Sequence, residues 1–107
     1  ETVVCFHHSG RVIYWYYNQK GRRLDRDYQL AQKISENNGY KVIPSEESDS
    51  KAAGFKDWFV KEFKKPGFTI EIGEKRKIEN SLPVNKLDQY FEENKKVLLI
   101  LFDYLIK

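Results

Sequence analysis

The sequence has little of what a disulfide-linked or membrane-spanning protein requires. It contains one cysteine, Cys5, which excludes an internal disulfide, and within "TVVCF" this residue is most simply a small apolar side chain. The longest apolar run, "VLLILF" at 97–102, is far too short to cross a bilayer, and no signal-peptide pattern opens the chain. Methionine is absent, so we expect a chain that begins at Glu1 to be a segment of a longer protein.

A strong excess of one charge is also missing. The chain has 19 Lys and Arg residues against 16 Asp and Glu residues, a formal net charge of +3, and the basic residues form no stripe in the sequence. Nucleic-acid binding therefore receives little support. What is present, 40% hydrophobic and 15% aromatic residues in 107 positions, is typical of one folded domain at most.

Apolar stretches predict the strands. "TVVCF" (2–6) and "GFTIEIG" (67–73) are typical of buried strands, "RVIYWYY" (11–17) of a further extended segment, and "YKVI" (40–43) of a short strand. The polar stretch "PSEESDS" (44–50) predicts a loop.

Helical spacing predicts three helices. One covers 25–37 and ends at Asn38-Gly39, and a second ends before Pro66. The third is a long final helix. The apolar face of the second helix is predicted from Phe55, Trp58, Phe59 and Phe63, and one side of the third from Val84, Leu87, Phe91, Leu98, Leu101 and Leu105.

The order of these elements, β, β, α, loop, α, β, α, predicts an α/β fold. Its strands are almost continuously apolar, as expected when helices pack on both faces of a sheet. A sheet with so few strands has exposed edges, which again favours a segment of a longer domain.

Glu71 is the most unusual residue of this pattern, because it places a carboxylate inside an apolar strand. An isolated carboxylate in a dry core costs several kcal/mol or more. Such a residue is normally paired with a cation, bound to a metal, or placed where the strand meets a cleft.

His7 and His8 stand at the end of the first strand. Ligands of open α/β sheets collect beyond the carboxyl ends of the strands. If the strands of His7 and Glu71 are parallel neighbours, imidazole and carboxylate converge in a metal-binding or acid/base arrangement. The residues alone leave other interpretations open: a hydrogen-bonded structural histidine, a Glu71 paired with a lysine, and an aromatic cluster at 14–17 that is simply core.

Three stretches carry a resemblance to a known family: "FHHSGRVIYW" (6–15), "AAGFKDWFVKEFKKPGFTIEIG" (52–73) and "NSLP" (80–83). Together they resemble the C-terminal part of a zinc carboxypeptidase of the carboxypeptidase A superfamily. The nearest branch is that of the bacterial γ-D-glutamyl-L-diamino acid peptidases, which trim peptidoglycan peptides. The resemblance runs in order along nearly the whole chain, and Asp57-Trp58 before Thr69-x-Glu71 is its most specific spacing.

The resemblance implies that residues 1–107 are the C-terminal portion of one zinc peptidase catalytic domain with a mixed sheet and helices packed on it. It implies a Zn²⁺ ligand at His7, through the pattern His-x-x-Gly-x-x-Ile-Tyr-Trp, with His8 as the fallback because His8-Ser9 is similar to the His-Ser pair of the animal enzymes. It also implies that Glu71 is the general base and acid acting on a metal-activated water. Ser9, Gly54 and Lys56 become candidate substrate-binding residues, with Lys56 either pairing with a carboxylate of diaminopimelate or solvated on its helix.

Departures from the family pattern limit this expectation. The chain contains no His-x-x-Glu, so the remaining zinc ligands are expected in a missing N-terminal part, as are the arginines and the asparagine that the family uses on its substrate. The substrate-covering tyrosine of the animal enzymes would fall near Asp49, where no tyrosine stands. Alone, the segment is expected to be inactive.

Three functions remain open at this point. The first is a segment of a zinc metallopeptidase that cleaves a γ-D-glutamyl-diamino acid bond in cell-wall peptides. The others are a non-catalytic module that binds such peptides, and a subunit that pairs with another chain through a sheet edge. The retained pair of His7 and Glu71 favours the first. Bacterial localisation, cell wall or cytoplasm, stays open.

Overall fold

The computed structural model describes residues 1–8, 10–48, 54–74 and 84–106. Its strands are β1 (Val3–His7), β2 (Val12–Tyr14), β3 (Lys41–Val42) and β4 (Gly67–Glu71). Its α-helices are α1 (Arg22–Asn38), α2 (Phe55–Phe63), α3 (Leu87–Asn94) and α4 (Val97–Leu105), and two short 3₁₀ turns span Ser45–Glu47 and Val84–Lys86. The α/β class predicted from the sequence is confirmed.

The four strands form one mixed sheet in the order β1-β4-β2-β3. β1 runs parallel to β4, β4 runs antiparallel to β2, and β2 runs parallel to β3. In the described part of the chain β1 is therefore an edge strand. The N–H of Val3 donates to Pro66 and the C=O of His7 accepts from Ile72. The N–H and C=O groups of Val4 and Phe6, which lie between them, point to the open side.

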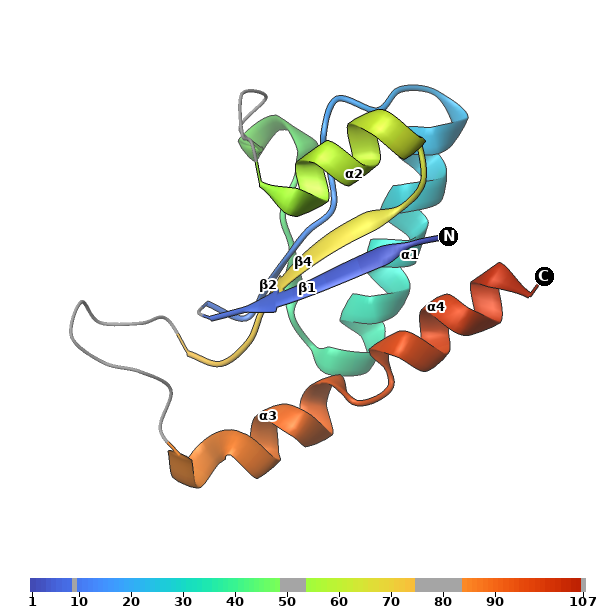
Figure 1. Cartoon of the computed structure of the whole chain (residues 1–107). Helices are drawn as coiled ribbons and strands as arrows, with labels where there is room; N and C mark the ends of the chain where they lie inside the picture. The colour runs from blue at the N-terminus through green and yellow to red at the C-terminus, as the bar shows by residue number, and fades with distance from the viewer. Residues whose placement is uncertain (9, 49–53, 75–83, 107) are drawn as a thin grey trace.

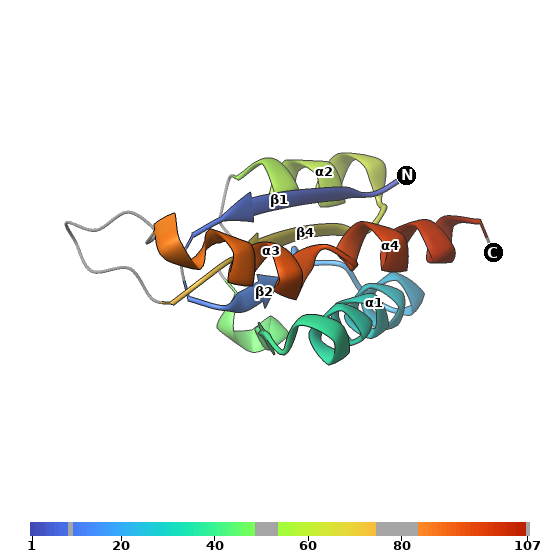
Figure 2. The same cartoon turned by 90° about the horizontal axis from the view of Figure 1, so that it is seen from below.

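Helices cover both faces of the sheet (Figures 1 and 2): α2 lies on one face, and α1, α3 and α4 lie on the other. The core is on the second face, where the side chains of β2 and β4 meet α1 and α4. Its fully buried members are Ile13, Trp15, Leu30, Ala31, Ile34, Tyr40, Phe68, Ile70, Val97 and Leu101. Successive side chains of a strand point to opposite faces, so Phe68 and Ile70 enter this core while Glu71 faces the side of α2.

Gly67 lets α2 approach the first residue of β4. A Cβ at this position would lie 3.0 Å from Val60 and 3.3 Å from Val3, closer than side chains normally pack. Because the last turn of α2 packs there, its first turn lies toward the carboxyl ends of β1 and β4 (Figure 1).

The helix over 25–37 is confirmed and begins three residues earlier than predicted, and it ends at Gly39 in the left-handed conformation that glycine favours. The single long final helix was wrong, because the chain is interrupted at Lys95-Lys96 between α3 and α4. Next to the break, the buried Asn94 amide donates to the Tyr90 carbonyl and to the Tyr40 hydroxyl. Such side-chain bonds compete with the regular helical pattern.

The predicted apolar faces of α2 and of the final helix were also partly wrong. On α2, Phe59 and Val60 are buried, whereas Phe55, Trp58 and Phe63 are exposed, and the ring of Trp58 contacts the other two. On α3 and α4 the buried positions are Tyr90, Asn94, Val97 and Leu101, whereas Leu87, Phe91, Leu98 and Leu105 of the predicted face are exposed. Each helix is apolar on more than one side, so spacing alone did not indicate which side is buried.

The position of Phe68 generates a stability prediction. Phe68→Ala removes a ring with 0% exposure and should lower the free energy of unfolding by about 3–5 kcal/mol. The matched control Phe91→Ala removes a ring that is 65% exposed and should cost less than about 1 kcal/mol. Urea denaturation measures both, and equal losses would contradict this assignment of the core.

Candidate active site

The candidate site lies at the carboxyl ends of β1 and β4. These strands are parallel neighbours, and their register pairs His7 directly with Glu71. Paired residues of adjacent strands project to the same face, so this imidazole and this carboxylate stand side by side. The condition that the sequence left open, parallel and adjacent strands, is met.

Glu71 is a partly buried carboxylate next to two imidazoles. Burial raises the pKa of Glu71, and the neighbouring imidazoles of His7 and then His8 oppose this rise. Oε2 of Glu71 is buried and has no hydrogen-bond partner within the described part of the chain, and the same holds for Nε2 of His8. A pairing of Glu71 with a lysine, one alternative that the sequence left open, is not among the ion pairs of the described residues.

Two backbone hydrogen bonds hold the strand ends together next to this pair. The N–H of Ile72 donates to the His7 carbonyl at 2.7 Å, and the N–H of Gly10 donates to the Gly73 carbonyl at 3.0 Å. The first joins His7 itself to the residue after Glu71, and the second joins the two chain segments that leave the strand ends. The separation of imidazole and carboxylate is therefore set by backbone pairing rather than by side-chain contacts.

A polar network behind β4, which the sequence did not reveal, supports the same end of the sheet. The Tyr40 hydroxyl donates to Glu93 at 2.7 Å and accepts from the Asn94 amide at 2.9 Å and from the Gly73 N–H at 3.5 Å. Arg11 forms an ion pair with Glu93 at 2.9 Å and lies over the Tyr40 ring. Burial, followed by the bond to Glu93, raises the pKa of Tyr40, so its hydroxyl stays protonated and can donate. No sequence pattern pointed to this network, because Asn94 lies in the polar run "EENKK" at 92–96.

The remaining predicted site residues are placed as follows. Gly54 precedes α2 and its N–H donates to the Asp57 carboxylate at 3.1 Å. Lys56 is 7% exposed, so a solvated lysine was the wrong alternative. Its ammonium forms an ion pair with Asp57 and donates to the Tyr16 carbonyl at 2.9 Å. Ser9, Asp49 and the stretch 80–83 lie outside the described residues.

The chemistry of these donors fits part of a zinc site. Nε2 of His8 and Oε2 of Glu71, both buried and without partners among the described residues, are ligand types that zinc accepts, and the imidazole of His7 is exposed beside them. Within the described ranges, however, no three His, Cys, Asp or Glu side chains gather closely enough to hold a metal ion. These residues can therefore supply only some of the donors that a zinc site needs.

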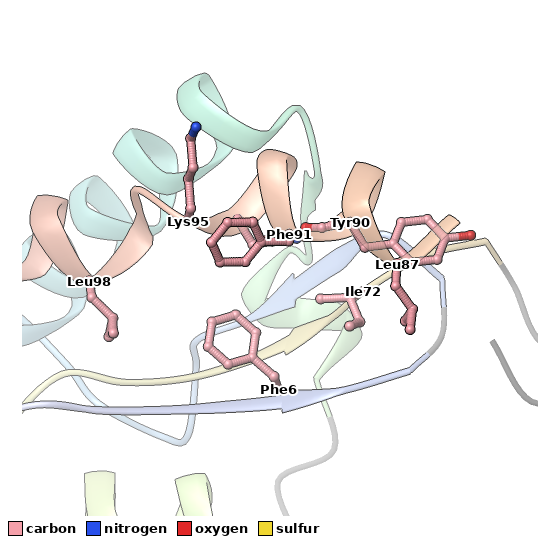
Figure 3. A pocket seen from close by; sticks show the side chains of 8 residues that line it. Phe6, Ile72, Leu87, Tyr90, Phe91, Lys95 and Leu98 are labelled. Carbon is pink, nitrogen blue, oxygen red and sulfur yellow. Dashed lines mark hydrogen bonds between the residues drawn. The ribbon is translucent and has the colours of Figure 1, made fainter. Parts of the chain in front are cut away.

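An apolar groove of about 380 Å³ lies near this end of the molecule but on the other face of the sheet. Figure 3 shows that Phe6 and Ile72 from the sheet face Leu87, Phe91 and Leu98 from the helices across it. Because Phe6 and Ile72 alternate with His7 and Glu71, the groove does not open onto the candidate site.

Comparison with known proteins relates this chain to a peptidase. Over 91 residues, 85% of the chain, it is 35% identical to the γ-D-glutamyl-L-diamino acid endopeptidase 1 of Lysinibacillus sphaericus. Over 100 residues, 92% of the chain, it is 29% identical to the uncharacterized protein YqgT of Bacillus subtilis (strain 168). These alignments cover 21% and 24% of the two relatives, so the chain spans less than a quarter of their length. No protein-family profile matches the sequence, and no described helix has the length and apolarity needed to cross a membrane.

The raised pKa of Glu71 predicts a pH-dependent stability cost. A carboxyl whose pKa is higher in the folded state holds its proton more tightly there, so stability falls as pH rises from the unfolded pKa through the folded one. Glu71→Gln removes this titration. The free energy of unfolding of the variant, relative to the unmodified chain, should therefore increase from acidic to neutral pH in urea denaturation. A falling difference for Glu71→Gln would contradict the assigned pKa direction.

Proposed function

We propose that this chain is part of a zinc metallopeptidase that hydrolyses the bond between γ-D-glutamyl and a diamino acid in bacterial cell-wall peptides. The observation that carries the proposal is the parallel register of His7 with Glu71, whose Oε2 has no partner in the described part of the chain. The endopeptidase relative supports the substrate class by its name. The resemblance to zinc carboxypeptidases supports the metal and the role of each residue.

In this proposal Glu71 is the general base and acid. Its pKa is raised by burial, which moves a carboxyl toward the neutral range where it can both accept and return a proton. The free Oε2 takes a proton from the attacking water and then delivers it to the leaving amine.

A histidine of this chain would hold the zinc ion, with His7 as the first candidate and His8 as the second. When bound, zinc would act as a Lewis acid on the scissile carbonyl and lower the pKa of the attacking water. The other ligands would come from a His-x-x-Glu outside this segment. Alone, the chain would therefore be inactive, and its missing N-terminal part is the partner that the proposal requires.

The proposal predicts separate effects for base and ligand in the complete protein. Glu71→Gln should lower kcat on a γ-D-glutamyl-diaminopimelate peptide roughly 10²- to 10⁴-fold while zinc content stays stoichiometric, because the amide cannot accept a proton. His7→Ala should lower zinc content itself, measured by atomic absorption. The substitution His8→Ala tells whether the second imidazole takes that role.

The non-catalytic binding module makes the opposite prediction. The complete, zinc-loaded protein would then bind the peptide without turnover, and Glu71→Gln would leave this binding unchanged. That result would contradict a peptidase and favour the binding module. The hypothesis of a subunit that pairs with another chain is supported by the open edge of β1. It would be favoured if turnover required a second chain.

Lys56 is proposed to select diaminopimelate over lysine, near the first turn of α2 that lies toward the site. Its ammonium is already engaged by Asp57 and the Tyr16 carbonyl, so a substrate carboxylate would have to share it. In the complete enzyme Lys56→Ala should reduce the ratio of kcat/KM for the two peptides, about tenfold for one lost charge-assisted hydrogen bond. Lys61→Ala, an exposed lysine on the same helix, is the control, and an unchanged ratio for Lys56→Ala would eliminate this role.

A further inference from the structure

A second hollow, of about 270 Å³, lies where the start of α1, the end of α2 and the segment 17–19 meet. Its charged lining residues are Arg23, Lys61 and Lys64, and no acidic side chain of the described ranges lines it. We name this hollow the basic pocket. Lys64 is three residues before the first residue of β4, whereas Glu71 is the last. The basic pocket therefore lies at the opposite end of β4 from the candidate active site.

None of the ion pairs found among the described residues holds a cation of the basic pocket. The ion pairs of the described residues involve Arg11, Arg26, Lys56, Lys86 and Lys95, and none involves a residue that lines the pocket. The nearby buried carboxylate of Asp27 accepts from Gln19 and Arg26 and is thus occupied. Exposed acids occur beside the pocket, at Asp25 and Glu62, but neither lines it.

Further basic residues extend this charge beyond the pocket. Lys20 and Arg22 precede Arg23 in the chain, Lys65 follows Lys64, and all three are exposed. The net charge of only +3 thus conceals a local concentration of six cations. Like charges held this close repel one another, and a bound anion relieves that repulsion.

The backbone around the basic pocket is fixed without a ligand. Lys64 has a left-handed conformation, with a φ of 55°, and its N–H closes α2 on the Val60 carbonyl at 3.1 Å. Its own carbonyl accepts from Nη2 of Arg26 on α1 at 3.2 Å. On the other side of the pocket, the Gln19 side chain accepts from the Tyr17 N–H and donates to Asp27. A preorganised site of this kind loses little order when it binds.

We propose that the basic pocket binds a phosphate-type oxyanion. A planar guanidinium can hold two oxygens of one anion, and two ammonium groups beside it add point charges, so a multivalent anion fits the set better than a single carboxylate. The anion is either free phosphate or the phosphate of a lipid headgroup, to which Lys20, Arg22 and Lys65 would add contacts with neighbouring headgroups. This inference is independent of the proposed peptidase activity.

The test compares two doubly substituted chains of equal net charge. Lys61→Glu with Lys64→Glu changes the basic pocket, whereas Lys33→Glu with Lys41→Glu changes exposed lysines on α1 and β3. Binding of inorganic phosphate is measured by calorimetry and by ¹⁵N chemical shifts against chloride of the same ionic strength. The pocket variant should bind at least about tenfold more weakly, and the control within about twofold of the unmodified chain.

A second arm identifies the source of the phosphate. Co-sedimentation uses vesicles of phosphatidylcholine with and without phosphatidylglycerol. If the chain binds the anionic vesicles, and the pocket variant loses this binding while the control keeps it, the anion is a lipid headgroup. If the chain binds only inorganic phosphate, and again only the pocket variant loses the binding, the anion is free phosphate. Arg23→Lys keeps the charge but removes the planar guanidinium that can hold two oxygens. It should weaken binding by less than the pocket variant does and by more than the control does. Equal effects of the two double variants, or no binding to either probe, would overturn the proposal.

Discussion

The parallel pairing of β1 with β4 is the interaction on which the rest of the structure depends. The two strands are separated by about sixty positions in the chain, and their register places His7 beside Glu71. A shift of this register by one residue would turn the carboxylate toward the apolar core and Phe6 or Ile70 toward α2. The buried face of β4, with Phe68 and Ile70, therefore fixes the position of Glu71 as strictly as any contact of Glu71 itself.

The environment of Glu71 is consistent with a site under strain for a functional reason. Burial without a hydrogen-bond partner costs free energy, and the described residues do not offset it with a cation in contact. The polar groups that are well paired, Tyr40, Arg11, Glu93 and Asn94, lie behind the strand and hold its end in place. Rigid support next to an unsatisfied carboxylate is the arrangement expected of a preorganised acid/base residue.

Much of this could be predicted from the sequence, because strong local patterns decide it. The strand around Glu71, the helix that ends at Gly39 and the convergence of His7 with Glu71 all follow from apolar runs, a helix stop and the geometry of parallel strands. The buried sides of α2 and α4 could not be predicted, because their apolar residues are distributed around the helix and the tertiary contacts choose among them. Lys56 was taken as solvated or substrate-facing, since a lysine gives no local sign that Asp57 and a carbonyl from residue 16 will enclose its ammonium.

The gathering of cations in the basic pocket was also beyond the sequence. Residues 20–23 and 61–65 are separated in the chain, and each is typical of an ordinary solvated stretch. Only the fold brings them together, through the contact of Arg26 on α1 with the Lys64 carbonyl that follows α2. The same holds for the break between α3 and α4, next to which Asn94 contacts Tyr40, a residue 54 positions away in the chain. In both cases long-range contacts outweigh the local pattern.

The central claim is that His7 and Glu71 are part of a metallopeptidase site whose other ligands lie outside this segment. The most direct test is to sequence the coding region through roughly two hundred codons upstream of Glu1, a length set by the usual size of one domain. The account predicts an in-frame His-x-x-Glu there, directly after a predicted strand. A start codon immediately before Glu1, with no such motif, would contradict it.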